Sequence, residues 1–485
     1  MLINRGHYIM LLRTVFLFSL LFAASVMSAQ DKKADAVFSG ALESVINLDG
    51  ALWNTSGDDF LSGERLKFFK WNSEQKDSAR APRYSNTPDM TFLGKKVYEC
   101  IFRFEDGKVS SVYISLYNRG DAGNIESGSV LQKTIGGFKE SIGKWTGVEG
   151  SKAQKDKIAK ANVYSITWKK GDVELSMKWS YSGRLSEKSG RTSDDFRAEY
   201  IKLDITKNAS ASGNDKTSGS KDDASAKSSS SKNGGLKENL KNENNDVYIA
   251  DIPMVDQGQK GYCVVAVVER VLRYYGQDID QHQIAQKAGT ENSGTSLSEF
   301  EKALKSLGKS LGVKYKSLYE SEIAKIGEQA ERGDLRCIPD TMKLVSQYNR
   351  YAKKAGCSKV DKNKYINGNM YDIGGMMNAM KPEGLKMLKV EGDKSAYARF
   401  TKQIKEYINL GIPILWSVRL GMVQEEKLNP QVNGGHMRLI IGYNEKDKKF
   451  IYSDTWGADH TFKKMTMDDA WLMTTGAYVL IPRRN

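Results

Sequence analysis

The sequence predicts an α+β protein whose two domains are joined by a low-complexity linker. The first half contains two pairs of alternating apolar and polar segments around short polar turns, which is typical of β-hairpins. Residues 208–246 between the halves contain almost no apolar residues. In the second half, helical periodicity gives way to strand-like segments along the chain. Helices followed by an antiparallel sheet place the second domain in the α+β class as well.

Composition and charge restrict the classes of protein to which the chain can belong. Its 485 residues are long for one domain, and 40% of them are hydrophobic, enough for more than one core. The formal net charge is +14, but lysine is scattered and no dense Lys/Arg block occurs. We therefore interpret the charge as favouring solubility and loose attraction to acidic surfaces, and expect no nucleic-acid partner. No pattern in the sequence specifies an oligomeric state.

Residues 1–29 have the pattern of a secretory signal peptide. Arg5 and Arg13 precede an apolar run from Val15 to Val26, and small residues surround Ala29. The run is short for a bilayer-spanning helix, although an uncleaved anchor is the alternative interpretation. We expect export to the periplasm, the cell surface or the medium, with no stable membrane span once the signal is removed.

Residues 31–207 are predicted to form a small α+β domain. Two hairpins flank a helix whose apolar residues recur at helical spacing, and one more strand follows. No catalytic constellation occurs in this part of the sequence, so we interpret it as an accessory or prosegment-like domain that inhibits, targets or binds substrate. The predicted strands are Val97–Phe104, Val109–Tyr117, Val163–Trp168, Val173–Trp179 and Tyr200–Ile205, and the predicted helix lies between Val130 and Trp145.

Residues 208–246 are predicted to be a flexible tether. They consist mainly of Ser, Asn, Gly, Lys and Asp, so they bury too little apolar surface to offset the entropy lost on ordering. A flexible lysine-rich segment is also an easy site for proteases. Residues 31–246 could therefore be removed on maturation.

Residues 247–485 are predicted to form the second domain. Gly411 and Pro413 end the last of its helices, and the periodicity then changes to that of strands. The predicted helices lie at 264–275, at 279–289, after a capping box at Ser296 and Glu299, across most of 319–382 and at 400–410, and the predicted strands at 414–420, 437–443, 450–453 and 477–481.

The chemically most informative stretch is DQGQKGYC, which ends at Cys263. Cys263 directly precedes an apolar run and so stands where a helix begins. A thiol attacks as its thiolate, which the partly positive N-terminus of a helix favours. Gly258 and Gly261 allow a turn that brings the amide of Gln257 beside the thiol, where it could donate to an oxyanion. Taken alone, Cys263 could instead be a buried structural residue.

A cysteine nucleophile needs a base and a group that orients the base. His436 follows two glycines and opens one predicted strand, and Asp454 ends the next strand. Neighbouring antiparallel strands would place these two side chains side by side. Trp456 lies just after Asp454 and could shield their hydrogen bond from water. We therefore predict Cys263 as the nucleophile, His436 as the base and Asp454 as the orienting group.

The remaining histidines and cysteines are assigned no catalytic role. His282 lies on a polar stretch and is predicted to be a surface residue, whereas His460 is predicted to lie in a loop near the site. Cys337 and Cys357 flank an amphipathic segment and could form a disulfide. Because no CxxC or Cys/His cluster occurs in the sequence, we expect no metal site.

These motifs resemble those of the papain-like cysteine peptidases over residues 247–485. DQGQKGYC is similar to the papain-type QGxCGSCW motif, with Gln257 in the oxyanion position. GGHMRLIIGYN is similar to the papain-type His segment, and SDTWG to its NSWG segment, with Asp454 in place of Asn. The segments GTSLSEFEKALKSLG and GIPILWSV resemble the bacterial double-glycine (bacteriocin-processing-like) branch.

The chain departs from the papain pattern at three points. Val264 stands where papain has Trp, and Lys260 stands where papain has a disulfide-forming Cys. The interval from Cys263 to His436 exceeds the ~130–150 residues expected of papain relatives. We attribute the excess to the helical segment 319–382, which could form one wall of the cleft.

Together the residues and the resemblance predict an exported cysteine peptidase that hydrolyses peptide or protein substrates without a metal or organic cofactor. In this prediction, Gln257 and the backbone amide of Cys263 bind the oxyanion. One alternative is another acyl transfer on the same residues, as in a transglutaminase or a peptidoglycan amidase. A second is an inactive peptidase relative that binds peptides or surfaces. Substrate preference depends on loops that line the cleft, and the sequence does not specify it.

Overall fold

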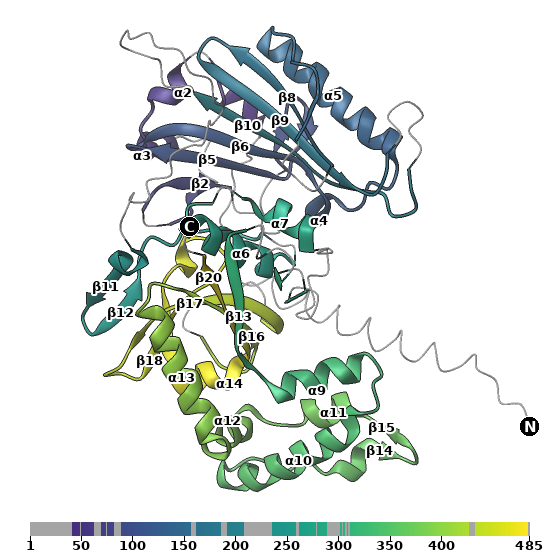
Figure 1. Cartoon of the computed structure of the whole chain (residues 1–485), viewed down its shortest axis with the longest axis vertical. Coiled ribbons are helices and arrows are strands. Elements are labelled where there is room, and N and C mark those ends of the chain that lie inside the picture. Colours follow the sequence, from purple (N-terminus) through teal and green to yellow (C-terminus); the bar gives the residue numbers. More distant parts are fainter. Residues whose placement is uncertain are drawn as a thin grey trace, which may run out of the picture. The chain divides into compact units, whose positions relative to one another are not determined.

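Two antiparallel sheets organise the chain, one within residues 70–207 and one within residues 240–482 (Figure 1). Both sheets carry helices, so the predicted α+β class is confirmed. The predicted signal peptide 1–29 and the capping box lie outside the described residues. The computed structural model describes residues 41–483, except 49, 63–68, 74, 82–88, 157–161, 186–191, 208–234, 259–260, 278, 289–300, 303, 306–307, 309–310 and 426–431.

The first sheet has the strand order β1-β2-β5-β6-β10-β9-β8-β7. The two predicted hairpins are the pairs β5–β6 and β8–β9. The predicted last strand, β10, lies between them and pairs with both β6 and β9, so it joins the hairpins into one sheet. The strands are β1 (Lys70–Trp71), β2 (Ser78–Arg80), β5 (Glu99–Glu105), β6 (Lys108–Asn118), β7 (Gln154–Lys155), β8 (Asn162–Lys170), β9 (Val173–Ser182) and β10 (Arg197–Lys207).

The predicted helix of the first domain is α5 (Gly128–Thr146), which lies along this sheet and contacts β8 and β10 (Figure 1). Leu131, Phe138 and Ile142 form its buried stripe, because residues three, four and seven apart share one helix face. The smaller elements around the sheet are η1 (Leu42–Ser44), α2 (Ala51–Asn54), α3 (Gly57–Ser62), β3 (Thr91–Phe92), β4 (Lys95–Lys96) and α4 (Arg119–Ala122).

The second sheet has the order β11-β12-β17-β16-β20-β13, with β18 paired to β17 and β19 paired to β18. The four predicted strands are β16, β17, β18 and β20, and the sequence analysis missed the other four. The strands are β11 (Leu240–Glu243), β12 (Asp246–Ile249), β13 (Val313–Glu320), β16 (Ile414–Leu420), β17 (Gly434–Asn444), β18 (Lys449–Ser453), β19 (Lys463–Thr466) and β20 (Thr474–Pro482).

The end of the segment predicted as a tether belongs to this second sheet. Residues 236–239 form η3 (Leu236–Asn239), and β11 and β12 follow as a hairpin whose second strand pairs with β17. β11 has few buried side chains, since it lies at the edge of the sheet, and its polar sequence therefore matched the composition of a linker. The part of the predicted tether at 208–234 lies outside the described residues.

The helices of the second half fall largely where periodicity predicted them. The segment 319–382 contains α9, α10 and α11, and the short hairpin β14–β15 separates α10 from α11. The sequence analysis missed α12 and α14. The elements are α6 (Cys263–Tyr274), α7 (Gln281–Ala288), α9 (Glu322–Glu331), α10 (Cys337–Lys354), η4 (Lys362–Tyr365), β14 (Ile366–Asn367), β15 (Met370–Tyr371), α11 (Ile373–Asn378), α12 (Pro382–Gly392), α13 (Lys394–Ile408), η5 (Ala458–His460) and α14 (Met467–Met473).

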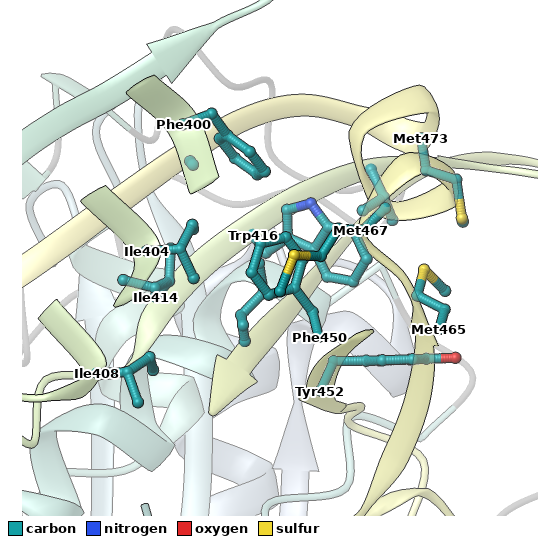
Figure 2. Close-up of a cluster of buried hydrophobic side chains, with 14 of the residues drawn as sticks. Phe400, Ile404, Ile408, Ile414, Trp416, Phe450, Tyr452, Met465, Met467 and Met473 are labelled. Carbon is teal, nitrogen blue, oxygen red and sulfur yellow. The ribbon is translucent and has the colours of Figure 1, made fainter. Parts of the chain in front are cut away.

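Helices cover both faces of the second sheet, because successive residues of a strand point to opposite faces. Ile414 and Trp416 of β16 belong to the core that also contains α13 and α14, whereas Leu415 between them belongs to the core around α6. Figure 2 shows Ile404 of α13 close to Ile414, in the cluster centred on Trp416. The sheet therefore holds the N-terminal end of α6 in a fixed position on one face.

Candidate functional site

Cys263 is the first residue of α6 and is half-buried. The rest of that helix is almost completely enclosed, and its valines pack in one core with residues of β16, β17 and β20. Burial of a Val side chain contributes about 1.5–3 kcal/mol, so several of them together fix the helix firmly. The thiol therefore lies at a rigid helix N-terminus that is still accessible, as a nucleophile requires.

His436 lies near the start of β17, where it pairs in register with Val418 of β16. Its side chain is fully buried, and its Nε2 lies 2.5 Å from Oδ1 of Asp454. Burial lowers the pKa of His436, but the charge and hydrogen bond of Asp454, with a smaller contribution from the Cys263 thiol, raise that pKa to about 9. Nδ1, the nitrogen that Asp454 does not use, has no other hydrogen-bond partner among the described residues.

Asp454 follows the last residue of β18, and the pairing of β17 with β18 brings it beside His436. Its second oxygen, Oδ2, lies 2.9 Å from Nε of Arg438, which is also fully buried. Burial raises the pKa of Asp454, but Arg438 and then His436 outweigh burial and hold this pKa well below its usual range. Asp454 is therefore ionised at neutral pH.

Arg438 is in turn held by residues outside the predicted site. Its Nη2 donates to Glu425 Oε1 at 2.9 Å, and its guanidinium lies over the ring of Tyr452, 5.0 Å from the centroid. Glu425 also accepts from the Tyr452 hydroxyl and pairs with Lys463 at 3.2 Å. The carboxylate of Asp454 is therefore one end of a buried network of alternating charges.

Trp456 stacks on the imidazole of His436, with ring centroids 4.2 Å apart and planes 5° apart. His460, in η5, meets the edge of the same indole, and its carbonyl oxygen accepts a hydrogen bond from the Asp454 amide at 2.8 Å. The indole thus covers one face of the imidazole, and His460 supports both Trp456 and Asp454. Trp456 lies where it can exclude water from the His436–Asp454 hydrogen bond.

Gln257 is buried between the segment that leads to α6 and the segment after β18. Its amide N–H donates to the Thr455 carbonyl at 2.9 Å, and its side-chain Oε1 accepts from the Thr455 hydroxyl at 2.6 Å. Since Oε1 is engaged by Thr455, the NH₂ end of the side chain is the end that can donate to a ligand. Gly258 has φ +70°, which a residue with a side chain rarely adopts.

Arg270 joins the helix of the nucleophile to the strand that leads to Asp454. From α6, its Nη1 donates to the Asp454 carbonyl at 2.7 Å and its Nη2 to the Ser453 hydroxyl at 2.6 Å. Its Nε donates to the Pro253 carbonyl at 2.8 Å. One buried side chain thus links α6, the segment before Gln257 and the end of β18.

The sequence analysis missed Arg438, Arg270 and Thr455. A signal for the two arginines was present, because each interrupts an apolar run, HMRLII and VVERVL, and a buried charge must find partners. No comparable signal marked Thr455, whose hydroxyl acts through a residue 198 positions away.

Three other residues differ from their predicted surroundings. His282 was predicted to be a surface residue but is buried, with its Nε2 3.5 Å from a carboxylate oxygen of Glu99. The polar sequence around it packs against a polar surface of the first domain, which periodicity cannot distinguish from solvent. Cys337 and Cys357 do not form a disulfide, and all four cysteines of the chain are free thiols.

Two further properties concern the described part of the chain only. Among those residues, no group of three or more His, Cys, Asp or Glu side chains is arranged to hold a metal ion. Within the same ranges, no helix has both the length and the apolar sequence needed to cross a membrane.

Two peptidase families match the second half of the chain. The model of the Peptidase C39 family matches residues 251–329, and that of the Peptidase_C39 like family matches residues 337–479. The first range contains Cys263, and the second contains both His436 and Asp454. The predicted resemblance to cysteine peptidases is confirmed over these residues, and the chain is a cysteine-type peptidase.

Solved structures with similarity to the chain include two peptidases. The peptidase domain of Streptococcus ComA, a bifunctional ABC transporter involved in quorum sensing, is 12% identical, with a TM-score of 0.23 over 48% of this chain and 99% of that one. Xylellain, a cysteine protease from Xylella fastidiosa, is 9% identical, with a TM-score of 0.25 over 51% of this chain and 89% of that one. No curated protein is significantly similar to the chain in sequence.

Proposed function

We propose that this peptidase hydrolyses peptide bonds with Cys263 as nucleophile, His436 as acid and base, and Asp454 as the group that orients the imidazole. The observation that carries the proposal is the 2.5 Å contact between His436 Nε2 and Asp454 Oδ1. This contact leaves Nδ1 for Cys263, whose thiol contributes to the raised pKa of His436. With that pKa at about 9, the imidazolium that pairs with a thiolate persists through neutral pH.

In this mechanism the Cys263 thiolate attacks the scissile carbonyl, and the oxyanion forms beside the helix N-terminus. The side-chain NH₂ of Gln257 and the backbone N–H of Cys263 donate to that oxyanion. Imidazolium gives its proton to the leaving amine, and the neutral imidazole then takes a proton from the water that hydrolyses the acyl-enzyme. Asp454 remains ionised throughout, because Arg438 keeps one of its oxygens paired.

Hydrolysis of a mixed fluorogenic peptide pool under reducing conditions tests the proposal. We expect Cys263→Ala and His436→Ala to lose at least about 10³-fold in kcat/KM, as is typical when a member of such a triad is removed. The matched control is Cys357→Ala, since Cys357 is also a half-buried free thiol and lies on a different core. Equal activity of the parent and Cys263→Ala would refute Cys263 as nucleophile. Transfer of the acyl group to an amine without hydrolysis of any peptide would refute the assignment as a hydrolase.

We also propose that the peptidase is exported. The support is the sequence of residues 1–29, in which basic residues precede an apolar run and small residues follow it. Expression of the full chain in a bacterial host, with fractionation and N-terminal sequencing of the product, tests this proposal. A product retained in the cytoplasm with its first residues intact would contradict it.

A further inference from the structure

The segment that carries Gln257 is contacted from outside the peptidase half by one buried arginine. Arg80, the last residue of β2 in the first sheet, donates from Nη1 to the carbonyl oxygen of Asp256 at 2.5 Å. The same nitrogen lies 3.0 Å from Oε1 of Glu99 and 3.8 Å from Oδ1 of Asp256. Since the peptide bond that follows this carbonyl leads directly to Gln257, Arg80 holds the backbone at the point where the oxyanion donor begins.

Asp256 itself stabilises the turn after Gln257. Its Oδ1 accepts from the amide of Gly258 at 2.8 Å, and its side chain is only 3% exposed. Asp256 precedes Gln257, and its carboxylate binds Gly258, which follows Gln257. Arg80 contacts both the backbone carbonyl and the carboxylate of this Asp256. A charge-assisted hydrogen bond in a buried position is about twice as strong as a neutral one, so this anchor is stiff.

The residue before Cys263 is also buried close to charged groups of the first domain. Tyr262 is buried, and burial raises the pKa of its hydroxyl, with electrostatic contributions from Arg119, Asp121 and Glu199 of the first domain. Its ring lies 5.8 Å from that of His282, whose Nε2 faces Glu99. The segment before Cys263 therefore has a direct first-domain contact at Asp256, and at Tyr262 it lies within the electrostatic influence of first-domain charges.

Further polar contacts join the same two parts, and residues 40–485 form one compact unit. Lys202 of β10 pairs with Asp280 at 2.5 Å, with both side chains at most 15% exposed. Ser180 of β9 donates to Gln286 of α7 at 2.8 Å. The ion pair favours one arrangement of the two parts, because separating Lys202 from Asp280 would leave a buried charge without its partner.

From these contacts we infer that the first sheet domain is a permanent part of the peptidase, in which Arg80 positions the oxyanion segment through Asp256. This inference rests on the proposed function and deepens it. An inhibitory prosegment would be expected to cover the nucleophile and to leave, whereas these contacts support the backbone behind Gln257. Arg80 is a positioning residue, since it acts on the reaction through Gln257.

The first test measures backbone hydrogen exchange and kinetics in the full chain. Arg80→Met alone would leave Glu99 buried without its cation. The informative variant is therefore the pair Arg80→Met with Glu99→Gln, which leaves the net charge of the buried site unchanged. Arg103→Met is the matched control. Arg103 lies on β5, and it lines a small cavity that Arg80, Glu99 and Asp256 also line. Thermal unfolding of each variant checks that it is folded.

We expect the amides of Gln257 and Gly258 to exchange faster in the double variant, whereas the amides of the α6 core stay protected. kcat should fall by about 10- to 100-fold, the cost of a displaced oxyanion donor, with little change in KM. Alkylation of Cys263 by iodoacetamide, which forms no oxyanion, should keep the rate of the parent. Arg103→Met should match the parent in all three measurements.

Unchanged exchange at Gln257 and Gly258 would overturn the positioning role, whatever the activity. If the parent chain hydrolyses no peptide but the double variant shows the expected faster exchange, the proposed function is refuted and the positioning role still stands. A fall in alkylation rate equal to the fall in kcat would also overturn it, because the effect would then lie at the thiol and not at the oxyanion.

The second test asks whether the first domain stays after the chain is cut. A site for a specific protease is introduced within residues 208–234, and the cleaved protein is analysed by size-exclusion chromatography. We expect both fragments to elute together and to keep the activity of the uncut chain. Separation of the fragments under native conditions would overturn the permanent association.

Discussion

At the scale of single residues, the geometry of the site depends on which partner each polar side-chain atom binds. Oδ1 of Asp454 contacts His436, and Oδ2 pairs with Arg438. Because both oxygens are engaged, the carboxylate cannot turn, and it holds the imidazole in one orientation. The Thr455 hydroxyl donates to Oε1 of Gln257, which fixes which end of that side-chain amide carries the donors. Two predictions follow from this division of atoms.

The charge of Asp454 sets the alkaline limit of activity. His436 is raised in pKa to about 9, so its imidazolium is present below that pH and is lost as the pH rises through it. Asp454→Asn keeps a hydrogen-bond acceptor but removes the charge, so we expect the alkaline limb of kcat/KM to move down by about 1 unit or more. Asp459→Asn, an exposed carboxylate in the same loop, should leave the limb in place. An unmoved limb in Asp454→Asn would contradict the assignment.

In the proposed mechanism, the hydroxyl of Thr455 orients Gln257 as the oxyanion donor. Thr455→Val removes its 2.6 Å hydrogen bond to Gln257 Oε1 with almost no change in volume, so the amide is free to turn its oxygen toward the site. We expect kcat to fall by about 10-fold or more while KM stays near that of the parent. Steady-state kinetics on a fluorogenic peptide measure both constants. Thr461→Val, whose hydroxyl bonds only the Ala458 carbonyl among the partners described, is the control.

At the scale of elements, the proposed nucleophile and the proposed orienting acid lie on different layers, whose relative position must be fixed. α6 packs on one face of the second sheet, while Asp454 leaves the end of β18 within that sheet. Apolar packing alone permits small shifts along the helix axis, because it is not directional. The three directional bonds of Arg270 fix the register of α6 against the end of β18.

Loss of this link should therefore reduce stability strongly. Arg270→Met leaves buried acceptors on Pro253, Asp454 and Ser453, each of which costs about 1–3 kcal/mol when unpaired. We expect the free energy of unfolding, measured with urea, to fall by about 3 kcal/mol or more. Arg273→Met, three residues further along α6, removes one ion pair with Glu269 in which the arginine is 26% exposed, and should cost clearly less than Arg270→Met. Similar costs for the two variants would argue against the link.

At the scale of the whole molecule, polar contacts join the two sheets and respond to pH. Burial raises the pKa of Asp280, but Lys202 and then His282 outweigh burial and lower that pKa to about 2. A carboxylate with a lowered pKa stabilises the folded state above its ordinary pKa near 4, and this stabilisation disappears as the pH falls toward 2.

Asp280→Asn should therefore lower stability at neutral pH but not in acid. The shift corresponds to about 2 kcal/mol, so we expect this difference in unfolding free energy between the parent and the variant at pH 6. The difference should shrink below pH 4 and continue to shrink as the pH falls toward 2, where Asp280 of the folded parent itself becomes protonated. A difference that stays constant between pH 6 and pH 3 would show that the ion pair with Lys202 is not its source. Denaturant unfolding at each pH provides the measurement.

Local sequence pattern was sufficient for much of this protein. The helix that begins at Cys263, the strands that carry His436 and precede Asp454, and both hairpins of the first sheet occur where periodicity placed them. The hairpins of the first sheet show their pattern as alternation, whereas α6, β17 and β18 are buried on nearly all sides and show it as nearly continuous apolar runs. Polar edge strands such as β11 lack this signal, since few of their side chains enter a core.

The tertiary structure alone decided what surrounds the site. Arg438, Arg270 and Arg80 act on atoms that lie many positions away in the chain, and no local period records such a contact. The same holds for His282, whose polar neighbours face another domain and not solvent. Chemistry that depends on residue type and short spacing can be predicted from the sequence, whereas the partners that hold those residues in place depend on which distant segments fold together.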